Sequence, residues 1–179
     1  MTSVRYTSPA VILHWLIALL IFVGFPLGVY MHDLPLSPTK LQLYSYHKWI
    51  GISVLLLVGL RLVWRVTHTP PPLPADLKAW ERAASHAAHG ALYLLMIAVP
   101  LTGWLMSSAK GFQTVWFGVL PLPDLVGKDR ALGETLEDAH EILNFVMLGL
   151  VSLHVAAALK HHFVERLPFL QRMGLGGKE

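Results

Sequence analysis

Four apolar stretches, each about as long as a lipid bilayer is thick, limit what this chain can fold into. They span residues 10–30, 44–64, 86–106 and 138–162. A helix needs about 20 residues to cross the hydrocarbon core, and in lipid the backbone must satisfy its own hydrogen bonds. The sequence therefore predicts an all-α fold, an integral membrane four-helix bundle. Its 179 residues suit a single domain over residues 1–179.

The composition excludes several classes of protein. Hydrophobic residues make up 54% of the chain and charged residues 14%, with a mean hydropathy of +0.53. Soluble domains carry about 25% charged residues, so a membrane protein is predicted. The basic residues flank the spans instead of forming a stripe, which argues against a nucleic-acid partner. The chain has no cysteine, so disulfides, iron–sulfur clusters, thiolate-ligated haem and covalently attached haem are excluded.

The distribution of lysine and arginine predicts the orientation in the membrane. Five of these residues fall on one side, namely Lys40, Lys48, Lys110, Lys128 and Arg130. Nine fall on the other side, namely Arg5, Arg61, Arg65, Lys78, Arg82, Lys160, Arg166, Arg172 and Lys178. Because cytoplasmic loops carry the excess of positive charge, we expect a multi-pass protein of the bacterial inner membrane with both termini in the cytoplasm.

Two long connections separate the last three spans. Residues 67–85 are rich in proline, which stops the preceding helix and stiffens the segment, so we predict a linker there. Residues 107–137 contain Trp116, Phe117, Pro121 and Pro123, and we predict a loop that lies against the membrane surface.

Four of the histidines inside the predicted spans are candidate ligands of a shared cofactor: His14, His47, His140 and His154. An ionisable side chain within the membrane is costly and is a functional-site hypothesis by default. His140 and His154 are 14 residues apart on one helix. In an α-helix that spacing corresponds to about 21 Å along the axis and about 40° around it. One helix therefore offers two ligands on nearly the same face, one near each membrane surface.

Depth in the membrane predicts the partners of these two ligands. His14 and His154 both fall in the cytoplasmic half of the bundle, whereas His47 and His140 both begin helices on the outer side. Two haems, each held by two imidazoles at one height, would explain all four, and such iron has no open position, which suits electron transfer. The alternatives are histidines that snorkel or bond a carbonyl, and a metal site, which lacks the carboxylate or thiolate companions that zinc or iron takes.

Other residues have weaker assignments. His86 and His89 share a helix face and could replace His14 or His154 as ligands or contact a propionate. His161 and His162 reach the cytoplasmic interface, where they are either solvated or able to protonate a quinone. Gly24 and Gly28 form a G-x-x-x-G motif that favours close helix packing. Positively charged side chains could pair with haem propionates or anchor the helices, namely Arg61, Arg65, Lys48 and Lys110.

The motifs around these histidines resemble those of a known family. They are ILHW with His14, YHKWIG with His47, HAAHGALYLLMIAVPLTGW, and DAHEILNFVMLGLVSLHVAAALKHHF with His140 and His154. Together they resemble the bacterial cytochrome b561 family, within the group that includes the cytochrome b subunits of nickel hydrogenases and formate dehydrogenases. The resemblance covers nearly the whole chain. It implies a four-helix protein with two haem b groups, His14 with His154 at the inner haem and His47 with His140 at the outer one.

Stand-alone members of this length most resemble superoxide oxidases, which pass electrons from periplasmic superoxide through both haems to ubiquinone. The resemblance implies that His161 lies by the quinone site. The outer side carries five basic and seven acidic residues, a formal charge of −2, so any attraction of superoxide needs a local cluster, for which Lys48, Lys110, Lys128 and Arg130 are the candidates. The alternative function is a membrane-anchor cytochrome b subunit that takes electrons from a periplasmic hydrogenase or dehydrogenase and passes them to quinone.

Overall fold

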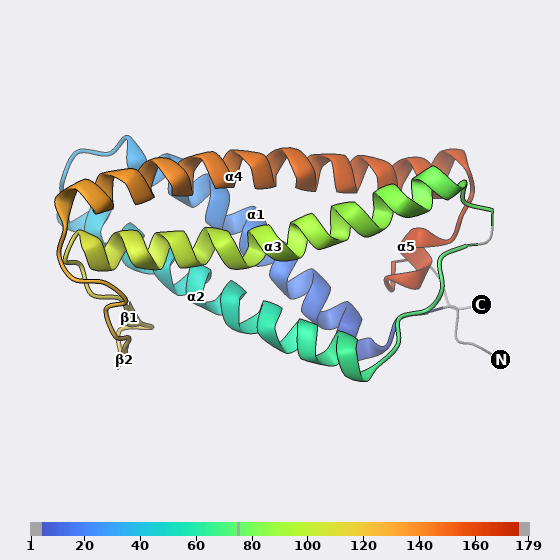
Figure 1. The fold of residues 1–179 in the computed structure, drawn as a ribbon, viewed down its shortest axis with the longest axis horizontal. Helices are drawn as coiled ribbons and strands as arrows, with labels where there is room; N and C mark the ends of the chain where they lie inside the picture. The colour runs from blue at the N-terminus through green and yellow to red at the C-terminus, as the bar shows by residue number, and fades with distance from the viewer. Residues whose placement is uncertain (1–4, 75, 176–179) are drawn as a thin grey trace.

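The computed structural model describes residues 5–74 and 76–175, and Lys178 of the charge count lies outside them. Four long helices, each antiparallel to the next, run roughly along the long axis of the molecule (Figure 1). They are α1 (Ser8–His32), α2 (Pro38–Thr67), α3 (Ala79–Ala109) and α4 (Arg130–Leu159). A π-helical turn, η1 (Lys160–Val164), continues α4, and a short helix, α5 (Phe169–Arg172), follows. Two two-residue strands, β1 (Val115–Trp116) and β2 (Leu120–Pro121), form a small hairpin between α3 and α4.

All four long helices are long and apolar enough to cross a membrane, which confirms the predicted fold class. Their outer surfaces expose large apolar side chains, for example Phe22 at 60%, Leu94 at 67% and Leu153 at 63%. Such a surface is unfavourable in water and favourable in lipid. The chain is therefore a multi-pass membrane protein.

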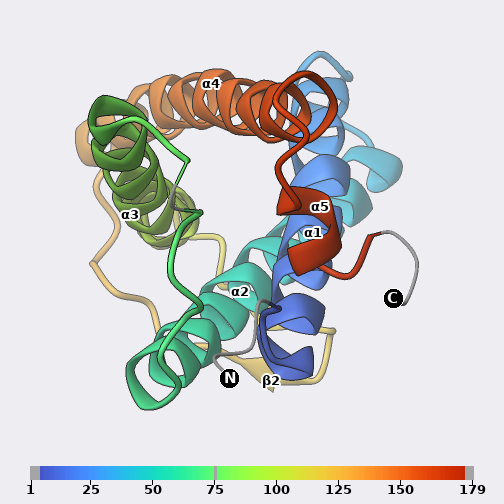
Figure 2. The same ribbon diagram turned by 90° about the vertical axis from the view of Figure 1, so that its right-hand side faces the viewer.

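Among the described residues, two clusters of buried apolar side chains lie inside the bundle. One joins Ile17 of α1 to Val54 and Val58 of α2, and the other joins Leu95 and Val99 of α3 to Met147 of α4. Seen end on, the helices follow the order α1, α2, α3, α4 around the bundle axis (Figure 2). α1 packs mainly on α2 and α3 mainly on α4. The sites described below lie between these two helix pairs.

The helices extend beyond the predicted apolar stretches. α4 begins at Arg130 instead of residue 138, because Asp129 caps it: the Asp129 carboxylate accepts a hydrogen bond from the Leu132 N–H at 3.1 Å. α3 likewise begins at Ala79 instead of residue 86, so part of the predicted linker is helical. Hydropathy marks the lipid-facing part of a helix, whereas capping residues set where the helix starts.

The hairpin loop packs on α2. The Trp49 indole donates a hydrogen bond to the Val115 carbonyl at 2.7 Å, and the Trp116 indole donates one to the Ser53 hydroxyl at 3.2 Å. We call this end of the bundle the hairpin end. At the opposite end, the Trp15 indole donates to the Met173 carbonyl at 2.9 Å, which ties the segment after α4 to the start of α1. We call that end the terminal end.

Replacing the cap of α4 tests how far local capping sets this helix start. Asp129→Ala is expected to lower the free energy of unfolding by about 1 kcal/mol, because the Leu132 N–H loses its acceptor. Asp129→Asn keeps an acceptor oxygen and should stay near the parent protein. Unfolding of the three proteins in one detergent would measure both effects, and equal losses in the two variants would contradict the capping role.

Candidate functional site

Four histidines meet in two pairs between the helices. At the hairpin end, the ring centroids of His47 on α2 and His140 on α4 lie 6.2 Å apart, and the ring planes make an angle of 88°. At the terminal end, the ring centroids of His14 on α1 and His154 on α4 lie 6.3 Å apart at 69°. α4 therefore contributes one imidazole to each pair, as its 14-residue spacing requires.

The two separations can be compared with the distance that a shared metal ion requires. A metal lies about 2 Å from a histidine nitrogen. With ring bonds of about 1.33 Å, that nitrogen is about 1.1 Å from the ring centroid. Two imidazoles on opposite sides of one ion therefore have centroids about 6.2 Å apart. Both pairs have this separation, so both are suited to hold one iron between two nitrogens.

His89 is a third imidazole near the terminal-end pair. Its ring centroid lies 5.3 Å from that of His154, which is shorter than the distance for two ligands on opposite sides of one ion. Its Nδ1 lies 3.4 Å from the Ser85 hydroxyl oxygen. Of the two candidate partners of His154, His14 has the better separation.

Backbone carbonyls orient the hairpin-end pair. His47 Nδ1 donates to the Gly24 carbonyl at 3.1 Å, and His140 Nδ1 donates to the Val99 carbonyl at 2.9 Å. Because a carbonyl only accepts, each Nδ1 carries the proton and each Nε2 keeps its lone pair. This is the usual arrangement of a metal-ligating histidine, in which the second nitrogen bonds a carbonyl or carboxylate.

Two glycines make room for these rings. A Cβ atom built on Gly28 of α1 would lie 3.0 Å from His47 Cε1, and one built on Gly103 of α3 would lie 3.0 Å from His140 Cε1. Gly24 of the predicted G-x-x-x-G motif approaches Ile50 of α2 in the same way, at 3.0 Å from Cγ2. The motif therefore both packs α1 on α2 and seats a candidate ligand.

A cavity of about 260 Å³ lies beside the hairpin-end pair. Four charged residues line it, namely Asp33, Lys48, Glu137 and Glu141.

Three of the four basic residues that the sequence suggested as a local cluster for superoxide make separate contacts in the structure. Lys110 pairs with Glu137 at 2.5 Å, and Arg130 pairs with Glu134 at 2.9 Å. Lys128 lies across Gly111, whose positive φ of +76° suits glycine. The hairpin end therefore combines positive and negative side chains.

A second cavity, of about 310 Å³, lies at the terminal end. Its lining includes Arg61 and Arg65 of α2 and Tyr93 of α3. Arg61 Nε donates a hydrogen bond to the Tyr93 hydroxyl at 3.0 Å, and the Arg65 guanidinium lies 6.0 Å from the Tyr93 ring centroid. Arginine is suited to bind carboxylates in a bidentate manner, so this cavity can accept an anionic group.

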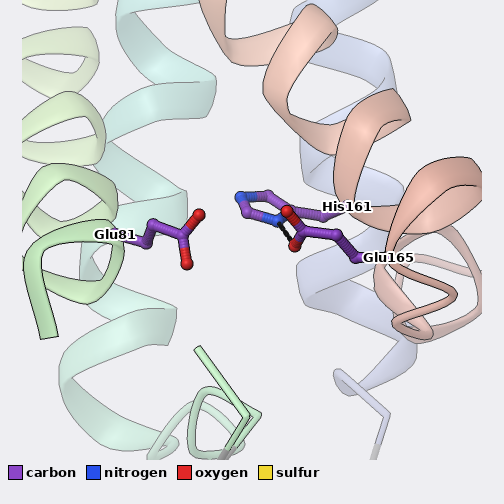
Figure 3. Close-up of side chains that lie close together, drawn as sticks. All are labelled: Glu81, His161 and Glu165. Carbon is purple, nitrogen blue, oxygen red and sulfur yellow. Dashed lines mark hydrogen bonds and ion pairs between the residues drawn. The ribbon is translucent and has the colours of Figure 1, made fainter. Parts of the chain in front are cut away.

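His161 lies in a cluster of charged side chains where α4 ends (Figure 3). Its Nδ1 lies 2.5 Å from a carboxylate oxygen of Glu165, and the other oxygen of Glu165 lies 2.7 Å from Lys160 Nζ. Lys160 Nζ also lies 3.4 Å from Glu81 of α3. Glu81, His161 and Glu165 place ligand atoms within 4.8 Å of one another, as a metal site would. The Lys160 ammonium already supplies positive charge between the two carboxylates, so no metal ion is needed there.

Sequence reasoning named all the histidines of these sites but missed their polar partners. Glu81 and Tyr93 reach these sites through tertiary contacts, and Glu165 lies directly after the turn that follows α4. In the sequence, the spacing of four residues between His161 and Glu165 is consistent with their contact, but this spacing is common on helix surfaces and does not single out a site.

Comparison with known proteins assigns the family. Residues 5–176 match the family described as prokaryotic cytochrome b561. The chain belongs to this family. Cytochrome b561 homolog 2 of Escherichia coli K12 is 33% identical over 174 residues, which cover 96% of this chain and 92% of the relative. A protein of Yersinia pestis named probable superoxide oxidase CybB is 26% identical over 179 residues, which cover 94% of this chain and 95% of the relative.

Membership has direct consequences for the site. A prokaryotic cytochrome b561 is a membrane electron-transfer protein, and the family implies haem b. The prediction made from the histidine motifs is confirmed at the level of the family. The paired imidazoles fit such a group by their separation and by the free Nε2 atoms at the hairpin end.

Glu81 ties the start of α3 to the end of α4 in this cytochrome b561, and its loss should be measurable. Its side chain is 8% exposed and accepts a hydrogen bond from the Lys78 N–H at 3.2 Å besides contacting Lys160. Glu81→Ala is expected to lower the free energy of unfolding by about 1–2 kcal/mol, because a helix cap and a partly buried ion pair are lost together. Glu134→Ala, which removes an exposed pair with Arg130, should cost less than about 0.5 kcal/mol. Equal losses in thermal unfolding would contradict this role.

Proposed function

We propose that this cytochrome b561 holds two haem b groups and carries electrons across the membrane, from superoxide at the hairpin end to ubiquinone at the terminal end. His14 and His154 are the proposed axial ligands of one haem, and His47 and His140 those of the other. The main support is that both imidazole pairs have the centroid separation that one shared iron requires, 6.3 and 6.2 Å.

Haem ligated on both faces by imidazole supplies a one-electron carrier without an open coordination position. The protein's part is to hold the ligands and to balance charge. Gly24 and Val99 carbonyls fix the tautomer of the hairpin-end ligands, and Gly28 and Gly103 leave space for their rings. Arg61 and Arg65 are the candidate partners for propionate groups at the terminal end.

The direction of transfer rests on three observations. The excess of lysine and arginine at the terminal end supports a cytoplasmic location for that end, and hence both termini in the cytoplasm of an inner-membrane protein. His161 follows His154 by seven residues, which is about two helical turns, and so lies on nearly the same face closer to the surface. It is the proposed proton donor or hydrogen-bond partner of ubiquinone. A relative named probable superoxide oxidase supports superoxide as the electron source.

A second candidate function has support from the charge at the hairpin end. Lys110 and Arg130 are paired with glutamates, and Asp33, Glu137 and Glu141 line the cavity there. A negatively charged donor gains little attraction from such a surface. The protein would then be a membrane-anchor subunit that receives electrons from a periplasmic hydrogenase or dehydrogenase. Copurification of a periplasmic redox subunit with this protein would favour this candidate.

Replacing single histidines tests the ligand assignment. We expect His14→Ala and His47→Ala each to lower the haem content of the purified protein from two groups per chain to about one, because one of two axial ligands is lost. His89→Ala is the matched control, since its ring is too close to His154 to share an iron across it, and it should keep both haems. Haem extraction and a redox titration measure the content, and a haem loss confined to His89→Ala would contradict the assignment.

Rapid mixing tests the reaction itself. The oxidised protein is mixed with superoxide in a stopped-flow instrument, with and without a soluble ubiquinone analogue, while haem absorbance is followed. We expect haem reduction by superoxide and reoxidation only when the quinone is present. Haem that stays oxidised with superoxide, but is reduced by a copurifying periplasmic subunit, would favour the anchor function.

A further inference from the structure

The residues around His161 form a more specific arrangement than the proposed function requires. Its Nδ1 bonds the Glu165 carboxylate, and the Phe169 ring of α5 stacks on the imidazole with centroids 5.2 Å apart and an angle of 27°. Figure 3 shows the imidazole extending away from Glu165 toward Glu81 of α3. The His161 side chain is 15% exposed, so the ring is held between α3, η1 and α5 with one nitrogen engaged.

The π-helical turn places Glu165 beside both of its partners. The Glu165 N–H donates to the Lys160 carbonyl at 3.2 Å, a bond that spans five residues. In an α-helix two residues five apart would point about 140° away from each other. In a π turn they complete about one turn and share a face, and such turns are frequent at functional sites. Arg166 then takes a positive φ of 56°, and the Leu167 N–H bonds the His161 carbonyl at 2.9 Å, which ends the helix directly after Glu165.

The charged groups that face His161 come from two elements. Glu165 and Lys160 belong to the end of α4 and its π turn, and Glu81 belongs to the start of α3. The segment of α5 contributes the uncharged Phe169 ring. Lys160 is shared by the two carboxylates, and Glu81 also caps α3. Among the charged residues that the structure describes, Glu165 is the one bonded directly to the imidazole.

We propose that Glu165 is a positioning residue for proton delivery to quinone: it holds the protonated His161 ring through Nδ1 and leaves Nε2–H as the donor. This inference rests on the proposed function, because it concerns the quinone half of that reaction. The arrangement is a carboxylate–imidazole couple in which the carboxylate fixes the ring and stabilises its charged form.

The proton and electron balance is as follows. Two superoxide anions each lose one electron and become O₂, and ubiquinone gains these two electrons and two protons to become ubiquinol. For each proton, the Nε2–H bond of His161 breaks and an O–H bond forms at a carbonyl oxygen of the quinone. The Nδ1–H stays bonded to Glu165, and water at the terminal end returns a proton to Nε2 between the two transfers.

Glu165 has the charge that this role needs. Hydrogen bonds from Lys160 and then from His161 hold the pKa of the Glu165 carboxyl below its usual value. Because the folded-state pKa is lowered, the carboxylate persists throughout the neutral range and is lost only as the pH falls through that lowered value. A glutamine at this position would keep the shape and remove the charge.

Glu165→Gln tests the proposal in the full-length, haem-loaded protein. The chemically reduced protein is mixed with decylubiquinone across the pH range in which histidine titrates. We expect the maximal rate of haem reoxidation by the quinone to fall about tenfold or more, with little change in the quinone concentration that gives half of that rate. The pH dependence of the rate should differ from that of the parent protein, because the ring loses the charged partner of its Nδ1–H. Glu165→Asp keeps the charge and should restore the pH dependence.

One control variant and one spectroscopic measurement separate this role from a structural one. Glu134→Gln makes the same change in another exposed ion pair, and it should behave as the parent protein. Nitrogen NMR of the His161 ring, assigned by loss of its signal in His161→Gln, should show the Nδ1–H tautomer at high pH in the parent protein and a mixture in Glu165→Gln.

The outcomes are distinguishable. A parent protein that reduces quinone while Glu165→Gln has the same pH dependence and the same ring tautomer would overturn the role of Glu165 alone. A reduced parent protein that does not react with decylubiquinone would overturn the quinone function, and this proposal with it.

Discussion

The structure depends on a constraint that the membrane imposes on imidazole. A histidine placed among lipid-facing helices must have a partner for its ring nitrogens, since water is scarce there and an unsatisfied polar group is costly. Here four such rings meet in two pairs, His14 with His154 and His47 with His140, at separations of 6.3 and 6.2 Å. The helices are arranged so that α4 reaches across to α1 at one end and to α2 at the other. The glycines and carbonyls of α1 and α3 then serve this arrangement, because they decide how closely a ring can approach and which nitrogen it presents.

The arrangement of charged side chains differs between the two ends of the bundle. At the hairpin end, Lys110 pairs with Glu137, which lines the cavity beside His47 and His140, and the β1–β2 hairpin packs on α2 through two tryptophans. At the terminal end, Arg61 and Arg65 line a cavity, while acidic groups gather instead around Lys160 and His161. The terminal end therefore has a cavity lined by arginines and, at a separate position, a cluster of carboxylates around Lys160 and His161. Membership in the prokaryotic cytochrome b561 family supports electron transfer. The charged groups around His161 are the basis of the proposed proton delivery.

How much could be predicted from the sequence differs between the helices and the site. The spacing of His140 and His154 was sufficient to predict one shared face, because an α-helix has a fixed rise and twist. The helix boundaries were harder to predict. Asp129 caps α4, which begins at Arg130, eight residues before the apolar stretch. Capping depends on a single side chain, whereas hydropathy is averaged over many residues. The partners of the predicted ligands, such as the carbonyls of Gly24 and Val99, carry no sequence signal at all, because every residue has a carbonyl.

The sequence by itself determined a four-helix membrane fold and the four histidines at two depths, because hydrophobic length and helical periodicity are local properties of the chain. Depth along the helices also predicted the pairs His14 with His154 and His47 with His140. Only the tertiary structure decided that His14 and not His89 has the separation suited to share an iron with His154, and that Glu165 bonds His161. These depend on how helices far apart in sequence pack and on a π turn whose five-residue hydrogen bond changes which side chains share a face. Contacts of this kind arise from packing and turn geometry, and hydropathy does not encode them.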